Sequence, residues 1–183
     1  MKFLKILEGI RTPFFDNFFS LITYFGDEVL FIVIGLLFYW CIDKKKGYYI
    51  LSVGLIGTVI NQFLKLVFRI PRPWVLDPDF KIVESAREAA TGYSFPSGHI
   101  TSATILFIGS VIRGNITKGL QFLFIFCLVL MAFTRCYFGV HFLSDVIGAF
   151  IISLIILFIV GKLFDKLEDN PNFDLIIAGA GIL

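Results

Sequence analysis

Residues 134–145 read TRCYFGVHFLSD, and this stretch decides how the rest of the chain is interpreted. It places Arg135, His141 and Asp145 between two strongly apolar runs. Ionisable residues are costly at membrane depth and more often mark a functional site than a structural one. His141 and Asp145 are four residues apart, so a helix would bring them to one face. An aspartate there can fix one ring nitrogen as a donor and leave the other as a base or nucleophile, although a buried structural pair would have the same spacing.

A second polar cluster, residues 94–99 with the sequence SFPSGH, precedes another apolar run. Proline suits the first turn of a helix, and helix N-termini expose free N–H groups that bind anions. Gly98 allows a ligand to approach the backbone closely, and the Ser97 hydroxyl adds a donor. This pattern predicts an anion site with His99 beside it; the alternative is an ordinary helix start with an incidental histidine.

Basic residues at the end of a third apolar run form the last cluster. Lys65, Arg69 and Arg72 are spaced as on one face of a helix that Pro71 and Pro73 terminate. Arg72 is confined between the two prolines, and a guanidinium held in this way suits bidentate phosphate binding. Lys65 is a second phosphate ligand in this interpretation, whereas Arg69 suits contact with lipid headgroups.

Composition identifies the environment in which these clusters lie. The 183 residues are 57% hydrophobic with a mean hydropathy of +0.88, and only 16% are charged. Soluble domains are nearer 45–50% apolar and about 25% charged. The chain is therefore expected to be an integral membrane protein in contact with the bilayer. A net charge of +2 without a basic cluster among exposed aromatics gives no reason to expect nucleic acid, and no protein partner is predicted.

Hydrophobic periodicity predicts an all-α polytopic bundle of about six helices. They are expected over residues 3–22, 29–42, 47–70, 99–112, 119–134 and 141–163. The first is amphipathic and either lies in the interface or crosses with a tilt. Residues 1–163 form one membrane-embedded domain, without a cleavable signal peptide at its start. Residues 164–183 are a tail whose apolar end suggests the truncated start of a further helix.

The longest polar connection, residues 74–98, is either a solvated loop or a lid over the substrate entrance. If the chain crosses six times, all three clusters fall on one side. Ten of the 16 Lys and Arg residues fall on the other side, and the positive-inside rule then places both termini in the cytoplasm. The active site would face outward from the plasma membrane of a bacterium. If the first helix lies in the interface, the N-terminus changes side but the clusters stay together.

Two histidines and one anion pocket suggest a division of labour. One imidazole can attack phosphorus to form a phosphohistidine, and the other can protonate the leaving alkoxide and later activate water. The phosphate oxygens would be held by Lys65, Arg72, Ser97, Gly98 and Arg135. These cations supply the positive charge, so neither a metal nor a cofactor is expected.

The spacing of the three clusters resembles the signature of the type 2 phosphatidic acid phosphatase family, shared with vanadium-dependent haloperoxidases. The matching elements are Lys65 with Arg72-Pro73, then residues 96–99, then Arg135 with His141 and Asp145. Thr134 departs from the serine usual in the family but keeps a hydroxyl. The resemblance implies a six-helix membrane phosphatase with His141 as nucleophile, Asp145 as its partner and His99 as the acid.

The expected function is therefore a metal-independent lipid phosphatase that acts on a phosphomonoester or diphosphate. Phosphatidate, phosphatidylglycerophosphate and polyprenyl diphosphate all suit the site. A phosphotransferase would use the same residues. A small transporter would need more mid-helix polar residues than Asn61 and Gln62, and a soluble haloperoxidase would be less hydrophobic.

Overall fold

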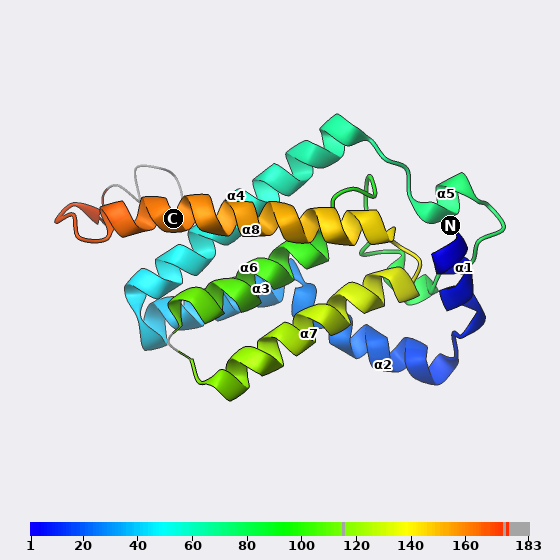
Figure 1. Ribbon diagram of the computed structural model, residues 1–183, viewed down its shortest axis with the longest axis horizontal. Helices are drawn as coiled ribbons and strands as arrows, with labels where there is room; N and C mark the ends of the chain where they lie inside the picture. The colour runs from blue at the N-terminus through cyan, green and yellow to red at the C-terminus, as the bar shows by residue number, and fades with distance from the viewer. Residues whose placement is uncertain (115, 174, 176–183) are drawn as a thin grey trace.

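The computed structural model describes residues 1–114, 116–173 and 175, and this part of the chain contains helices but no strand. The longer helices run between two ends of an elongated bundle (Figure 1). In chain order the elements are α1 (Lys2–Gly9), α2 (Pro13–Thr23), η1 (Tyr24–Gly26), α3 (Glu28–Leu37), η2 (Phe38–Ile42), α4 (Lys44–Phe68), α5 (Pro73–Leu76), η3 (Glu84–Ala86), α6 (Gly98–Arg113), α7 (Lys118–Tyr137) and α8 (Leu143–Leu167). The predicted helical class is confirmed.

Helix α6 forms the centre of the bundle and packs against α4, α7 and α8. Most of its residues are buried, including Thr104 and Ile105. Small residues on α4 allow close packing around it: a methyl group at Gly57 would come within 2.4 Å of the Ile105 side chain. Similarly, a methyl group at Gly54 would overlap the Phe31 ring of α3. Helices in membranes commonly pack through such small residues.

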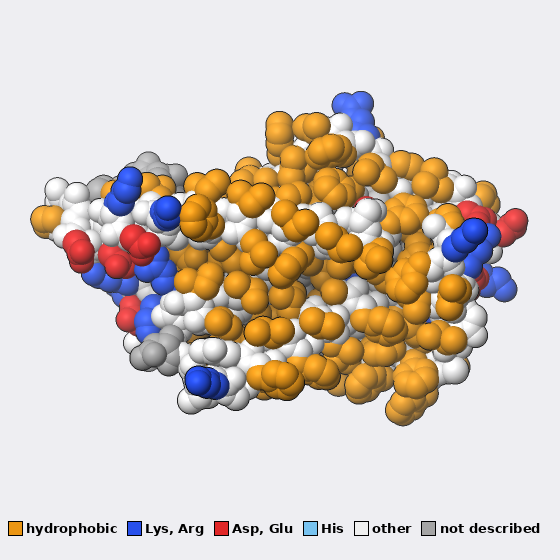
Figure 2. All heavy atoms as spheres, viewed as in Figure 1, with side chains coloured by type: hydrophobic (Ala, Val, Ile, Leu, Met, Phe, Trp, Pro, Cys, Tyr) orange, Lys and Arg blue, Asp and Glu red, His pale blue; other side chains and the backbone are white. Residues whose placement is uncertain are grey.

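The outer surface of the bundle is suited to lipid. Large apolar side chains such as Val59, Phe63, Phe122 and Phe158 are more than half exposed. On the face drawn in Figure 2, hydrophobic side chains cover the middle, and Lys, Arg, Asp and Glu gather mostly toward the two ends. By length and composition, α4 with its extension through α5, α7 and α8 can each cross a membrane. A fourth crossing is possible if the bent pair of segments 13–26 and 28–42 forms one span.

The N-terminal segment differs from the prediction of one helix over residues 3–22. Thr12 and Pro13 start a new helix there, with the Thr12 hydroxyl accepting a hydrogen bond from the Phe15 N–H at 3.4 Å. Helix α1 lies beside α5, where Lys5 Nζ is 2.7 Å from an Asp77 carboxylate oxygen. The N-terminus is therefore at the same end as Arg72, as expected for the alternative in which the first helix does not cross separately and the N-terminus changes side.

The C-terminal segment also begins later than predicted. Helix α8 continues to Leu167, past the expected boundary at residue 163. Phe173 is buried and packs edge-to-face on Tyr48 and Phe164, so the start of the tail is part of the bundle. The apolar segment expected to begin a further helix, residues 175–183, lies outside the described residues apart from Leu175.

Candidate active site

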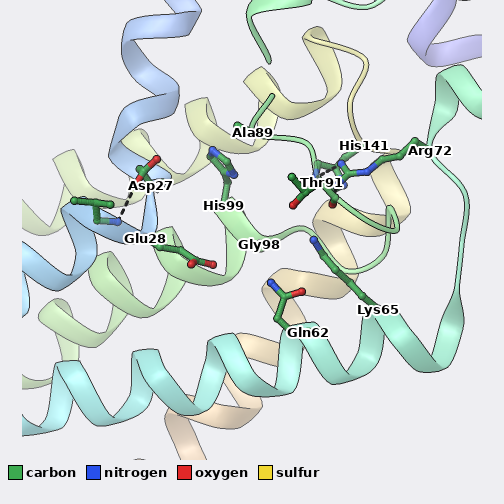
Figure 3. A pocket seen from close by; sticks show the side chains of 12 residues that line it. Asp27, Glu28, Gln62, Lys65, Arg72, Ala89, Thr91, Gly98, His99 and His141 are labelled. Carbon is green, nitrogen blue, oxygen red and sulfur yellow. Dashed lines mark hydrogen bonds between the residues drawn. The ribbon is translucent and has the colours of Figure 1, made fainter. Parts of the chain in front are cut away.

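The three sequence clusters meet at a cavity of about 360 Å³ near one end of the bundle (Figure 3). Lys65, Arg72, Gly98, His99 and His141 all line it. They come from the end of α4, the loop before α5, the start of α6 and the loop between α7 and α8. Residues up to 76 positions apart in sequence therefore share one small volume. A phosphoryl group placed there would have both imidazoles and two cations around it.

The end of α4 positions the two basic residues. The helix stops at Phe68 because Arg69 adopts a left-handed conformation, with φ +48°, and donates its N–H to the Lys65 carbonyl. Lys65, one turn earlier, is buried and lines the cavity, whereas the Arg69 side chain is exposed and bonds the Leu66 carbonyl. Arg69 thus lies outside the site.

Arg72 is held by three backbone carbonyls. Its Nε donates to Gly92 O at 3.1 Å, one terminal nitrogen to Thr91 O at 2.7 Å and the other to Val140 O at 2.9 Å. The last nitrogen is also 3.1 Å from His141 Nε2. A guanidinium fixed at this many points needs no reordering to meet an anion, which favours electrostatic stabilisation of a transition state.

The α6 N-terminus contributes backbone and His99. Gly98 is the first residue of the helix, and Ser97 is its N-cap. Ser97 is fully buried, its N–H donates to Asp145 O at 3.3 Å, and its hydroxyl has no partner among the described residues. An unpaired hydroxyl this close to a helix N-terminus is well suited to an anion.

His141 and Asp145 are paired as the spacing predicted. His141 Nδ1 lies 3.5 Å from Asp145 Oδ2, longer than an ordinary hydrogen bond, and such contacts often tighten when substrate binds. Asp145 is fully buried at the start of α8, where Oδ2 also accepts from the Ser94 hydroxyl and from the Phe142 N–H. These donors hold the carboxylate ionised and aimed at the imidazole. Ser94 is a contact that the spacing of charged residues alone did not reveal.

Electrostatics favour a neutral His141. Burial lowers its pKa from the ordinary value of 6.5, and the Arg72 and Arg135 guanidinium groups act in the same direction, although Asp145 opposes them. With Nδ1 facing a carboxylate, the proton of the neutral ring belongs on Nδ1. Nε2 then carries the lone pair, which faces the Arg72 guanidinium at the cavity, and an unprotonated nitrogen is the form a nucleophile requires.

Arg135 lies behind this cavity rather than in its lining. It is 1% exposed, and one terminal nitrogen donates to the Thr23 hydroxyl at 2.6 Å. It lines a second cavity of about 210 Å³ that shares His99, Asp27 and Ala89 with the first. Its Nε and other terminal nitrogen have no partner among the described residues. Donors are thus available toward the region where the two cavities meet, at His99.

Acidic residues on the opposite wall were not anticipated as part of the site. Asp27 and Glu28 line the larger cavity together with Gln62 (Figure 3). In sequence they indicated only acids at a helix N-terminus, and Asp27 does cap α3 by accepting from the Val29 N–H at 2.8 Å. Residues 26–28 are typical of a turn before a helix, but the sequence does not show that this turn lines the cavity. Among the described residues, no three His, Cys, Asp or Glu side chains group as metal ligands, and metal-free chemistry stays a prediction.

Known proteins resemble this chain along most of its length. It is 31% identical over 137 residues to undecaprenyl-diphosphatase BcrC of Bacillus subtilis, covering 74% of this chain and 65% of that protein. It is 29% identical over 181 residues to phosphatidylglycerophosphatase B of the same organism, covering 87% and 80%. The chain therefore spans slightly less than two thirds of the first relative and more of the second.

A solved structure has the same fold. The crystal structure of a transmembrane PAP2 type phosphatidylglycerolphosphate phosphatase from Bacillus subtilis aligns with a TM-score of 0.74 at 25% identity, covering 92% of this chain and 86% of that one. With the apolar helices described above, this likeness identifies an integral membrane protein. The model of the PAP2 superfamily matches residues 45–169, a range that holds all three clusters, and the chain belongs to that superfamily.

Proposed function

We propose that the chain is an integral membrane lipid phosphatase that hydrolyses phosphomonoester or diphosphate groups without a metal. The observation that carries the proposal is the juxtaposition of His141 Nε2, Arg72 and Lys65 at one cavity, with Asp145 on the far side of the imidazole. The family supports the reaction class, and the two relatives above are named as phosphatases of lipid phosphates.

The proposed reaction has two steps. His141 Nε2 attacks phosphorus, the P–O bond to the lipid breaks, and His99 gives its proton to the leaving oxygen. Asp145 stabilises the Nδ1–H of the charged ring. Water then attacks the phosphohistidine, its proton passes to His99, the P–N bond breaks, and inorganic phosphate leaves. Lys65, Arg72, the Gly98 backbone, the Ser97 hydroxyl and Arg135 are proposed to stabilise the phosphoryl oxygens in both steps.

Lipid access is proposed to occur between α3 and α4. Glu28 and Val29 of α3 and Gln62 and Lys65 of α4 line the cavity. The side chains of Val29 and of Phe63, which follows Gln62 on α4, are both more than 60% exposed. The cavity therefore opens beside apolar, lipid-facing surface. The headgroup would enter there while its acyl or prenyl chain stays in the bilayer. This geometry also suits a phosphotransferase, which would replace the attacking water by another acceptor.

The decisive test is phosphate release in detergent from phosphatidate, phosphatidylglycerophosphate and a polyprenyl diphosphate. Wild-type protein should release phosphate from at least one of them in the presence of EDTA, and His141→Ala and His99→Ala should not. Vanadate, which mimics pentacoordinate phosphorus, should inhibit competitively. Strict dependence on a divalent metal, or normal turnover by His141→Ala with folding intact, would contradict the proposed mechanism. Transfer of the phosphoryl group to an added lipid or sugar in place of release would identify the phosphotransferase.

We further propose that the helical bundle, including the start of the tail up to Phe173, acts as one membrane domain in a bacterial cytoplasmic membrane with the site facing outward. Moving the N-terminus to the site end changes the charge balance on which the orientation was predicted. Nine Lys and Arg residues now belong to the site end and seven to the other. Without Lys65, Arg72 and Arg135, which have a chemical role, the numbers are six and seven. The main remaining support is the run of three lysines at 44–46, which sits in a very short connection between membrane segments.

Orientation can be measured directly by labelling single cysteines in whole cells with a membrane-impermeant maleimide, in a background where the native cysteines are replaced. Lys81→Cys in the loop at the site end should react, and Lys118→Cys at the start of α7 should not. The reverse pattern would place the active site on the cytoplasmic face.

A further inference from the structure

The bend at Gly26, Asp27 and Glu28 lies outside the residues matched by the superfamily model, yet it forms one wall of the cavity. It packs directly on His99: a methyl group at Gly26 would lie 3.0 Å from the His99 carbonyl oxygen and 3.1 Å from its Cβ. The bend is therefore held in place against His99, a residue proposed for catalysis. The carboxylates of Asp27 and Glu28 consequently have a defined position.

The cavity is electrostatically divided. Lys65 and Arg72 lie on one wall with His141 beside Arg72, Asp27 and Glu28 lie on the opposite wall, and His99 lies between the two walls (Figure 3). Glu28 and Lys65 line the same cavity. A phosphoryl group bound by the cations and attacked by His141 Nε2 would leave the rest of the cavity to the leaving group. At about 360 Å³ the cavity holds roughly ten water volumes, more than a phosphoryl group alone requires.

We propose that Asp27 and Glu28 select the leaving group: they disfavour a second phosphate and favour lipid phosphomonoesters whose adjoining groups donate hydrogen bonds, such as hydroxyl or ammonium. This inference rests on the proposed function. A diphosphate would place its lipid-side phosphate near two carboxylates, and like charges repel there, although Glu28 is exposed and Asp27 is only partly buried. A hydroxyl or ammonium at the same place would instead find an acceptor.

The test uses two substrates with one tail, farnesyl phosphate and farnesyl diphosphate, and compares initial kcat/KM values. Wild-type protein should prefer the monophosphate. Glu28→Gln removes a charge at nearly constant size and should reduce that preference on the order of tenfold, mainly by raising kcat/KM for the diphosphate. Asp27→Asn should act in the same direction, because asparagine also caps a helix and the bend should persist. Asp43→Asn is the matched control, since Asp43 caps α4 at the other end of the bundle by accepting from the Lys46 N–H.

Binding separates this inference from the proposed function. In the His141→Ala background, the protein should bind farnesyl phosphate more tightly than farnesyl diphosphate. Glu28→Gln should strengthen binding of the diphosphate alone. An unchanged ratio in both assays, or an equal loss for both substrates, would overturn the selective role of the wall. If wild-type protein hydrolyses neither lipid but the binding ratio shifts as stated, the proposed function fails and the selectivity of the wall stands.

Discussion

The two ends of the bundle carry similar numbers of basic residues but use them differently. At the end near the tail, where α4 begins and α6 and α8 end, the charges pair with one another. Arg113 binds Asp165 at 2.6 Å and Glu168 at 3.6 Å, and Lys45 donates to the Glu168 carbonyl. At the site end, Lys65, Arg72 and Arg135 are each at most 9% exposed.

The buried cations have no carboxylate within ion-pair distance among the described residues; Arg72 and Arg135 bond carbonyl and hydroxyl oxygens instead. Burying a charge without a counterion is expensive, so such groups persist where an anion is to be bound. Exposed ion pairs cost little to form and contribute little. Burial without a counterion, rather than the amount of charge, therefore distinguishes the site end from the end that contacts headgroups and solvent.

The sharpest test of this contrast replaces one arginine at each end by lysine. Arg72→Lys keeps the charge but loses the fork that bonds three carbonyls and faces His141. We expect kcat/KM for a lipid phosphate to fall by about 10²–10³. Arg113→Lys keeps a charge that can still pair with Asp165, far from the site, and should leave activity within about twofold, with a loss of stability of about 1 kcal/mol from the lost hydrogen bond to the Gly161 carbonyl.

Both variants are compared by phosphate release and by thermal unfolding in the same detergent. If Arg113→Lys reduced activity as much as Arg72→Lys, the two ends would not differ in the way proposed. If Arg72→Lys kept normal activity, a simple positive charge would suffice at that position.

A smaller effect is expected from the support behind the nucleophile. Ser94 and Ser153 are both fully buried, but Ser94 donates to Asp145, whereas Ser153 donates to the Ala149 carbonyl within α8. Ser94→Ala should weaken the orientation of Asp145 and reduce kcat by about tenfold with little change in KM, since a hydrogen bond to a charged group contributes about 1.5–3 kcal/mol. Ser153→Ala should change neither constant by more than about twofold.

Rescue distinguishes positioning from packing. Ser94→Thr keeps the hydroxyl and should restore part of kcat if the hydrogen bond to Asp145 is what matters. Equal losses in Ser94→Ala and Ser94→Thr would indicate that only the volume of the side chain is important there.

The same contrast explains what could be predicted from the sequence. The spacing of His141 and Asp145, the prolines around Arg72 and the apolar runs are local patterns, and they predicted the helices from α3 onward and the meeting of the three clusters. The break at Thr12 and Pro13 was missed because the hydrophobic periodicity continues across it, although a capping threonine followed by proline is a helix-start signal. If residues 13–26 and 28–42 form one bent span in place of two crossings, the N-terminus changes side and the charge count changes with it.

Residues that act through tertiary contacts could not be predicted from the sequence. Asp27 and Glu28 could be interpreted only as helix-capping acids until the packing of Gly26 on His99 was known. Ser94 belonged to a recognised segment but its partner, Asp145, is 51 residues away. Phosphate binding by Arg135 stays a prediction, and its bond to Thr23 of α2 could not be foreseen, since it depends on how the N-terminal helices fold back.

The subtlest difference between the ends concerns protons. Because burial lowers the pKa of His141, the folded protein keeps this ring neutral at pH values where an unfolded chain, with an ordinary pKa near 6.5, would protonate it. The unfolded state then binds more protons, so His141 lowers the free energy of unfolding progressively as pH falls below about 6.5, by at most about 1.4 kcal/mol per pH unit.

His141→Asn removes this contribution. The free energy of unfolding of wild type minus that of the variant should therefore become more negative between pH 7.5 and 5.5, as measured by unfolding in detergent. Titratable groups that do not interact with His141 are common to both proteins and largely cancel in the difference. A difference that grows more positive at low pH would mean that Asp145 holds the ring protonated, and His141 would then be unable to act as a nucleophile in its resting form.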